Sequence, residues 1–348
     1  MGMRESNKIE NREFWADSIR MLACFLVTIG HFFQSMVQAE MFAGSELYDW
    51  FIQSIYSFHV PLFFLCSGYF YQKSSVVNNW QAWKRNIVDK GINLGIPYVV
   101  FTVITWGLKT VFSRAVHQEA GGLLKTLFIF PVSPYWYLYV LFFLFCLTPT
   151  FKDGKIALLG LIISIVLRIF YINKGNALLG YLTPKIFENE IWFVAGMCLR
   201  LKNFPGAMKA SGWIWTGIIC LIVFLGGSVV ASIKYGKSWN AYVSFVLGGL
   251  ACASVFILNG NYWKHHKNYK IVKRFARYTM PIFLMHTIFA AGIRSALFLL
   301  GGTNTMVHIF IGLGISFAGP IFTMRLAKRH KWIDFLVFPK GYIRNSGK

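Results

Sequence analysis

The first long apolar run of the chain begins Asp17-Ser18-Ile19-Arg20-Met21-Leu22-Ala23-Cys24-Phe25-Leu26-Val27-Thr28-Ile29-Gly30-His31. A run of this length and apolarity predicts a membrane-spanning helix. Ionisable side chains are costly inside such a helix and usually serve a function there. Arg20 and His31 are therefore the leading candidates for chemistry.

Arg20 and His31 are expected to lie on one face of this helix. Over the interval between them, steps of about 100° return to within about 20° of the starting direction, with a rise of about 16 Å. Asp17 precedes Arg20 by three residues, so we expect an ion pair along the same face. The alternative is structural: a buried Arg20–Asp17 pair that only braces the helix bundle, and a His31 that only binds a neighbouring carbonyl.

Apolar runs continue along the whole chain, which is 56% hydrophobic and 14% charged. A soluble protein carries about 25% charged residues, so we expect an all-α, polytopic transmembrane helix bundle. It forms a single domain over 1–348, with tails 1–16 and 325–348. The ten expected spans are 17–37, 51–71, 91–112, 135–150, 156–172, 188–201, 212–232, 239–258, 279–300 and 305–324.

The net charge of +22 is explained by membrane orientation and does not indicate nucleic-acid binding. With these spans, 25 Lys and Arg residues fall on the side of the N-terminus and 7 on the other side. Basic residues concentrate in cytoplasmic loops, so both termini are predicted to be cytoplasmic. The six cysteines lie in apolar runs without paired spacing, which favours neither disulfides nor a metal cluster.

His31 is the best candidate for a general base. A neutral imidazole can take a proton from a hydroxyl while that hydroxyl attacks a carbonyl. Gln34 and Ser35 lie one turn further along and are placed to orient the ring. The guanidinium of Arg20 suits binding of phosphate or polarisation of a carbonyl oxygen. His286, a second histidine inside an apolar run, is expected to be structural.

Two further stretches are open to both a functional and a structural interpretation. Ser67 and Gly68, in the second span, permit close approach of either a ligand or another helix. Lys84, Arg85 and Lys90 form a basic cytoplasmic stretch. They suit the phosphates of an anionic cofactor, or they reflect membrane orientation alone.

Aromatic and acidic residues mark the predicted outer surface. Tyr135, Trp136 and Tyr137 open the fourth span, either as a membrane-interface belt or as a stacking platform for sugars. Glu188 and Glu190 begin the sixth span, where a carboxylate can bind an acceptor hydroxyl or lie among lipid headgroups.

With these residues placed, the chain resembles the acyltransferase-3 family of integral membrane proteins. The family hallmark, a basic residue and a histidine with ten residues between them, is matched by Arg20 and His31, and the usual acidic residue by Asp17. Weaker motifs are similar at Phe63–Phe70, Trp136–Leu138, Phe193–Met197 and Tyr278–His286. One pattern departs: the family's Arg-x-x-Arg pair reads Lys90 and Asn93 here.

The resemblance implies an O-acyltransferase of the bacterial cytoplasmic membrane, in the branch that modifies surface polysaccharides and exopolysaccharides. It would move an acyl group, with acetyl expected, from acetyl-CoA to a hydroxyl of a glycan or its lipid-linked precursor, without a metal. In this interpretation His31 is the base, Arg20 holds the donor or polarises its carbonyl, and Asp17 orients Arg20. The expected partners are acyl-CoA, the glycan and membrane lipids.

The remaining site residues follow from the same interpretation. The expected donor-binding residues are Arg20, Lys84, Arg85, Lys90, Ser67 and Gly68. The expected acceptor-binding residues are Gln34, Ser35, Tyr135, Trp136, Tyr137 and Glu190. Two alternatives stay open at this point: a proton-coupled transporter or glycan flippase, and a non-catalytic scaffold. A transporter is not expected to bind CoA.

Overall fold

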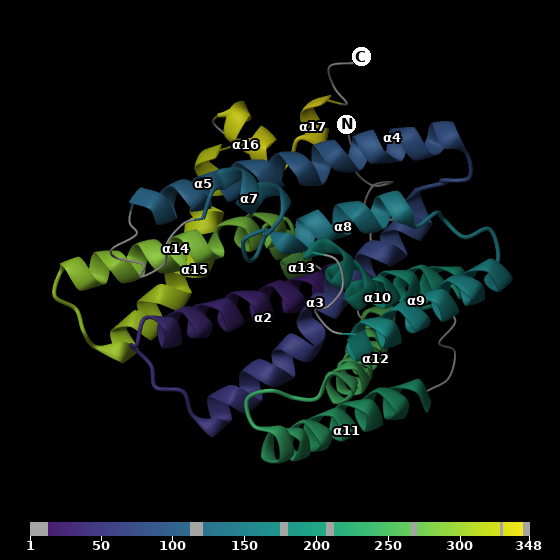
Figure 1. The fold of residues 1–348 in the computed structure, drawn as a ribbon, viewed down its shortest axis with the longest axis horizontal. Coiled ribbons are helices and arrows are strands. Elements are labelled where there is room, and N and C mark those ends of the chain that lie inside the picture. The colour runs from purple at the N-terminus through teal and green to yellow at the C-terminus, as the bar shows by residue number, and fades with distance from the viewer. Residues whose placement is uncertain are drawn as a thin grey trace.

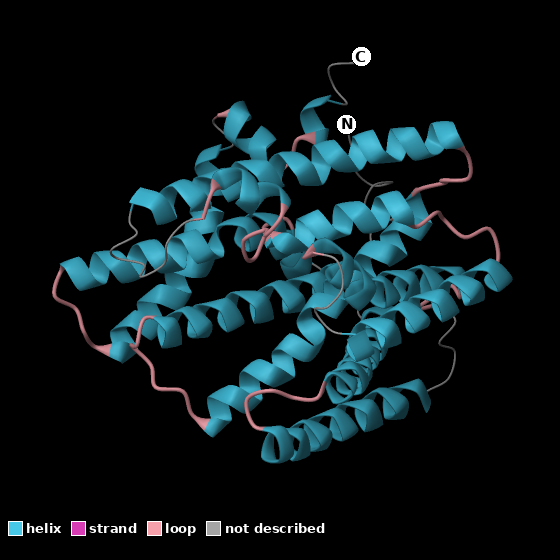
Figure 2. Cartoon of the chain, viewed as in Figure 1, coloured by secondary structure: helices cyan, strands magenta, loops and turns pink. Residues whose placement is uncertain are grey.

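The computed structural model describes residues 13–111, 121–174, 180–206, 212–265, 270–327 and 330–343. Every regular element in these ranges is a helix, and no strand occurs in them (Figure 2). The predicted all-α class is therefore confirmed. Helix labels follow Figure 1.

Eight helical stretches are long and apolar enough to cross a membrane, judged by length and composition within the described residues. They confirm a polytopic helix bundle. Their bounds are Phe14–Gln38 (α2), Glu46–Ser74 (α3), Trp80–Val111 (α4, η1 and α5), Gly154–Lys174 (α9), Gly212–Tyr235 (α11), Ala241–Trp263 (within α12, Ala241–His265), Thr279–Leu299 (α14) and Thr305–Ala327 (α15).

The helix of the third predicted span begins before the span itself. Its helix starts at Trp80 as α4 (Trp80–Lys90), passes through a π-helical segment (η1, Gly91–Gly95) and continues as α5 (Ile96–Val111). Lys84 and Arg85 lower the hydropathy of the first turns, so the apolar signal alone begins about ten residues too late.

The fourth and sixth predicted spans are helices but are not among the eight. α8 (Trp136–Leu147) has only 12 residues, and α10 (Leu182–Leu201) carries charged side chains in its first half. The other short helices are α7 (Leu123–Phe128), α13 (Lys270–Ala276), α16 (Lys331–Val337) and α17 (Lys340–Ile343).

Helix α3 crosses the bundle and packs against α2, α10, α11 and α12. Its crossing with α10 brings the two backbones into direct contact. A Cβ on Gly68 would lie 1.9 Å from the carbonyl oxygen of Phe193, and a Cβ on Gly196 would lie 2.0 Å from that of Leu65. Small residues allow helices in a membrane to approach this closely. This packing accounts for Gly68, and its role in donor binding stays a prediction.

Helices α2 and α14 lie side by side and run in the same direction (Figure 1). Near one end of the contact, the Cys24 thiol donates to the carbonyl oxygen of Thr279, with sulfur and oxygen 3.4 Å apart. Near the other end, Arg294 Nη1 donates to Ser35 Oγ at 2.8 Å. These contacts flank His31 and hold its helix against α14.

Candidate active site

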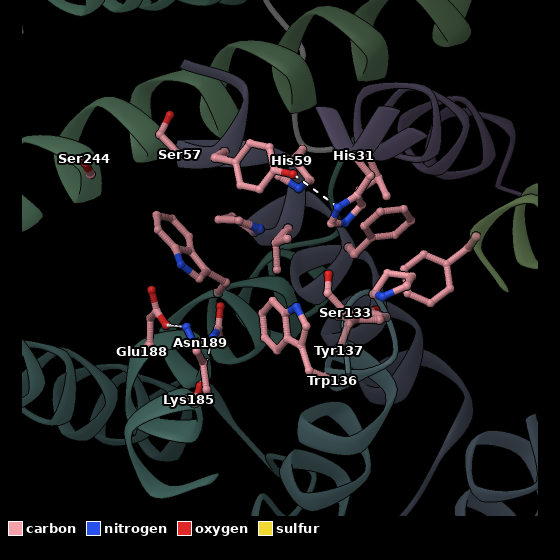
Figure 3. Close-up of a pocket in the computed structure, with 18 of the residues that line it drawn as sticks. His31, Ser57, His59, Ser133, Trp136, Tyr137, Lys185, Glu188, Asn189 and Ser244 are labelled. Carbon is pink, nitrogen blue, oxygen red and sulfur yellow. Dashed lines mark hydrogen bonds and ion pairs between the residues drawn. The ribbon is translucent and has the colours of Figure 1, made fainter. Parts of the chain in front are cut away.

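A pocket of about 290 Å³ lies among the long helices, and His31 is part of its wall (Figure 3). Some lining residues lie in the C-terminal halves of α2 and α9 and in the middle of α3. Others lie in the first part of α10, α12 and α14. The rest lie at the start of α8 and just before it. His31 lies at one end, and Lys185 and Glu188 lie at the other (Figure 3).

The ring of His31 is held by a short hydrogen-bond chain. The hydroxyl of Tyr56 donates to Gln34 Oε1 at 2.6 Å, and the same hydroxyl oxygen lies 3.4 Å from His31 Nδ1. Because the single proton of Tyr56 is used on Gln34, its oxygen is left to accept from Nδ1–H. In a neutral ring with its proton on Nδ1, Nε2 carries no proton, which is the state a general base needs.

Two more histidines lie close to His31. The ring of His286 is tilted against that of His31, with centroids 5.5 Å apart. Nδ1 of His286 lies 2.9 Å from two backbone carbonyl oxygens, so it carries the proton, and its buried Nε2 has no hydrogen-bond partner among the described residues. His59 lines the pocket and packs against Tyr56, with ring centroids 4.6 Å apart. The structure therefore places His286, which was expected to be only structural, beside the candidate base.

Arg20 lies outside this pocket, nearer the start of α2. The predicted ion pair is present, with Nη1 of Arg20 3.9 Å from Oδ1 of Asp17. The guanidinium also lies over the ring of Phe70, 4.3 Å from its centroid. One turn back along α3, Ser67 Oγ is 3.0 Å from the hydroxyl of Tyr137, which lines the pocket. Arg20 and the pocket residue Tyr137 thus contact neighbouring turns of α3.

Three aromatic rings form the pocket wall at this point. Tyr137 packs against Phe63 and Phe283, with centroids 5.5 and 5.7 Å away, and the two phenylalanine rings are 6.1 Å apart. All three line the pocket. A group passing from Arg20 to His31 would meet this aromatic wall.

The predicted acceptor-binding residues are only partly brought together. Gln34, Trp136 and Tyr137 line the pocket. Tyr135 is fully buried outside the lining and donates to the carbonyl oxygen of Leu284 at 2.8 Å. Ser35, which binds Arg294, is likewise not in the lining. An acceptor-binding role for Tyr135 or Ser35 stays a prediction.

Of the two glutamates that begin α10, Glu188 lines the pocket and Glu190 does not. Along an α-helix, residues two positions apart point to different sides. The structure therefore draws attention to Glu188, whereas an acceptor-binding role for Glu190 stays a prediction.

The predicted donor-binding cations also lie outside the pocket lining. Lys84 and Arg85 are exposed on α4, and Lys84 Nζ lies over the ring of Trp80 at 5.0 Å. Lys90 Nζ lies over Phe145, 3.9 Å from its centroid. Their roles in donor binding stay predictions.

The far end of the pocket carries a charged cluster that the sequence analysis did not single out. Arg168 on α9 donates from Nη1 to the Glu188 carbonyl oxygen at 2.8 Å and lies 3.6 Å from Glu188 Oε1. Lys185 Nζ lies 2.8 Å from the other carboxylate oxygen, Oε2. The available signal was Arg168 itself, an ionisable residue inside an apolar span.

Comparison with known proteins identifies the family of the chain. Residues 13–325 match the family model described as an acyltransferase domain. The chain belongs to this family. The chain is also similar to nodulation protein NolL of Mesorhizobium japonicum, at 23% identity over 248 residues. That similarity spans 68% of this chain and 60% of the length of NolL. No solved structure matches the chain.

Proposed function

We propose that this membrane acyltransferase moves an acetyl group from acetyl-CoA to a hydroxyl of a cell-surface glycan or its lipid-linked precursor. The observation that carries the proposal is His31 in the pocket wall, with its Nδ1 3.4 Å from the hydroxyl oxygen of Tyr56, whose proton is donated to Gln34. The pocket also offers the ring of Trp136, and aromatic faces suit the apolar faces of sugars.

The proposed transfer needs one base and no reactant besides the acceptor hydroxyl and the thioester. His31 Nε2 takes the proton of the acceptor hydroxyl as its oxygen attacks the thioester carbonyl carbon. The new C–O ester bond forms, the C–S bond breaks, and the CoA thiolate leaves. The imidazolium then returns its proton to that sulfur, which regenerates the neutral ring.

The donor is proposed to approach from the side of Arg20. The phosphates of CoA carry negative charge, and the charge pattern predicts a basic cytoplasmic face. Arg20 provides a guanidinium for a phosphate or for the thioester carbonyl. The acyl end must then pass Tyr137 to reach His31, so this route includes movement of the aromatic wall.

The test is transfer of radiolabelled acetyl from acetyl-CoA into the glycan fraction of membranes from the host. Wild type, His31→Ala and Arg20→Ala are compared at matched levels of folded protein, with the exposed His330→Ala as the histidine control. We expect incorporation by wild type and by His330→Ala, and loss of at least about 100-fold in His31→Ala. Equal incorporation by His31→Ala would remove the proposed base.

A binding measurement distinguishes an acyltransferase from a transporter. Binding of acetyl-CoA to the purified protein, measured by calorimetry, is expected for the acyltransferase and not for the transporter. A folded wild-type protein that neither binds acetyl-CoA nor incorporates label would contradict the proposed donor.

A further inference from the structure

We propose that the Arg168–Lys185–Glu188 cluster is a subsite for an acidic group on the acceptor, so that the preferred acceptor is a sugar bearing a carboxylate or a phosphate. The inference rests on the proposed function and specifies its acceptor. The cluster and His31 line one pocket, at opposite ends (Figure 3). An acceptor held by its acidic group at one end can thus present a hydroxyl to the base at the other.

Charge within the pocket favours an anion. Among the described residues that line it, three carry a formal charge: the cations Arg168 and Lys185 and the single carboxylate Glu188. One positive charge is therefore left uncompensated. Burial makes this excess matter, since the Arg168 side chain is 8% exposed and the charge is poorly screened by water.

Hydrogen-bond donors remain available at the same place. Nε of Arg168 is buried and has no partner among the described residues. Lys185 has three N–H donors and uses one on Glu188 Oε2. A guanidinium and an ammonium side by side match the several acceptor oxygens of a carboxylate or phosphate. An incoming acidic group would complete a set of contacts that Glu188 fills only in part.

Aromatic rings around the cluster provide the complementary sugar surface. Lys185 Nζ lies over the ring of Trp136 at 5.2 Å, and Arg168 lies over that of Phe245 at 5.2 Å. Trp192 packs against Phe245, with ring centroids 5.3 Å apart, and all three aromatic residues line the pocket. The subsite thus combines positive charge with flat apolar faces, as an acidic sugar requires.

The test measures binding without any acyl donor. The full-length protein in lipid nanodiscs is titrated by calorimetry with octyl β-D-glucuronide, octyl β-D-glucoside and octyl β-D-glucoside 6-phosphate. The first two differ only by carboxylate against hydroxymethyl at C6. We expect at least one acidic glycoside to bind about tenfold or more tightly than the neutral glucoside, which corresponds to about 1.4 kcal/mol.

Lys185 is the residue to change, because it is more exposed than Arg168 and its loss is less disruptive to folding. Lys185→Gln should reduce the preference to about twofold or less, whereas Lys185→Arg should retain it. Lys125→Gln is the matched control. Lys125 also lies over an aromatic ring, that of Phe130 at 5.4 Å, but it is exposed and outside the pocket lining.

Each outcome bears on one claim. A preference for the glucuronide assigns a carboxylate and a preference for the phosphate assigns a phosphorylated acceptor, and both support the subsite. Equal binding of all three glycosides overturns it, as does an unchanged preference in Lys185→Gln. Selective binding without acetyl transfer would contradict the proposed function and leave the acidic subsite standing.

Discussion

Single residues decide which nitrogen of His31 is placed to serve as the proposed base. Tyr56 has one hydroxyl proton, and the 2.6 Å bond to Gln34 uses it. The hydroxyl oxygen can then only accept from His31 Nδ1. His286, Tyr56 and His31 pack within one cluster of rings, so the imidazole is held in orientation as well as in tautomer.

The first prediction concerns Tyr56. Tyr56→Phe keeps the ring but removes the hydroxyl, so both tautomers of His31 become accessible. We expect kcat for acetyl transfer to fall about tenfold with little change in KM for acetyl-CoA, because donor binding is placed at Arg20. The pair Tyr56→Phe and Gln34→Ala should be far from additive, since both break one chain. Strict additivity of the two losses would contradict this coupling.

The second prediction separates Arg20 from His31. Arg20→Ala should raise KM for acetyl-CoA by about tenfold or more, because the cation proposed to contact the donor is lost. Arg20→Lys should recover part of that loss, since it keeps the charge and loses only the bidentate geometry. Steady-state kinetics over a range of acetyl-CoA concentrations provide the measurement. A change confined to kcat in Arg20→Ala would place Arg20 in the chemical step instead.

At the scale of helices, the crossing of α3 and α10 fixes the site. α3 carries Tyr56 and His59, and α10 carries Lys185 and Glu188, so both ends of the pocket depend on this crossing. Its contact point is backbone against backbone at Gly68 and Gly196. Gly68 and Gly196 therefore affect the site indirectly, because they set how closely α3 and α10 approach each other.

The third prediction tests that crossing. Gly68→Ala would place a methyl group 1.9 Å from a carbonyl oxygen, so the helices must separate. We expect a loss of about 1–3 kcal/mol in the free energy of unfolding, read as a lower thermal unfolding temperature in detergent. Gly107→Ala is the control, because a Cβ there has no neighbour within 4 Å among the described residues. Equal effects of the two substitutions would refute the crossing.

Helices were the most predictable part of the fold. Long apolar runs indicated α2, α9, α11, α14 and α15 because the membrane demands about twenty apolar residues per span. The sequence did not predict where the helix of the third span begins, because the charged helix α4 continues into the apolar helix α5 through η1 without a break. Hydropathy reports burial in lipid and does not report where a helix begins.

The site was predictable only along single helices. The spacing of Arg20 and His31 follows from helical periodicity, and the ion pair to Asp17 from the same rule. The partners of His31 come from other helices, Tyr56 on α3 and His286 on α14, and no periodicity within one helix predicts such neighbours. The cluster around Arg168 was missed for the same reason.

At the scale of the whole molecule, the charge asymmetry predicts how the bundle sits in the membrane. The segment from Glu40 to Asp49, which includes the first turn of α3, has three acidic and no basic residues, whereas α4 carries exposed Lys84 and Arg85. Cytoplasmic loops attract basic residues, so these two segments should face opposite sides.

The fourth prediction tests this orientation in intact cells. A membrane-impermeant thiol reagent should label Glu46→Cys above the wild-type background without permeabilisation. It should label Arg85→Cys only after the membrane is opened. Both positions are exposed in the structure, so access is not limited by packing. Labelling of both positions in intact cells would contradict the predicted orientation.

The size of the pocket bears on whether water could hydrolyse the donor in the proposed reaction. A pocket of about 290 Å³ with His31 in its wall has room for water molecules as well as for an acceptor hydroxyl. Water is then a rival nucleophile whenever a thioester arrives and no glycan is in place. The three-ring wall at Tyr137 lies on the proposed route of the thioester to His31. A wall that opened only to a filled pocket would spare the cell's acetyl-CoA from wasteful hydrolysis.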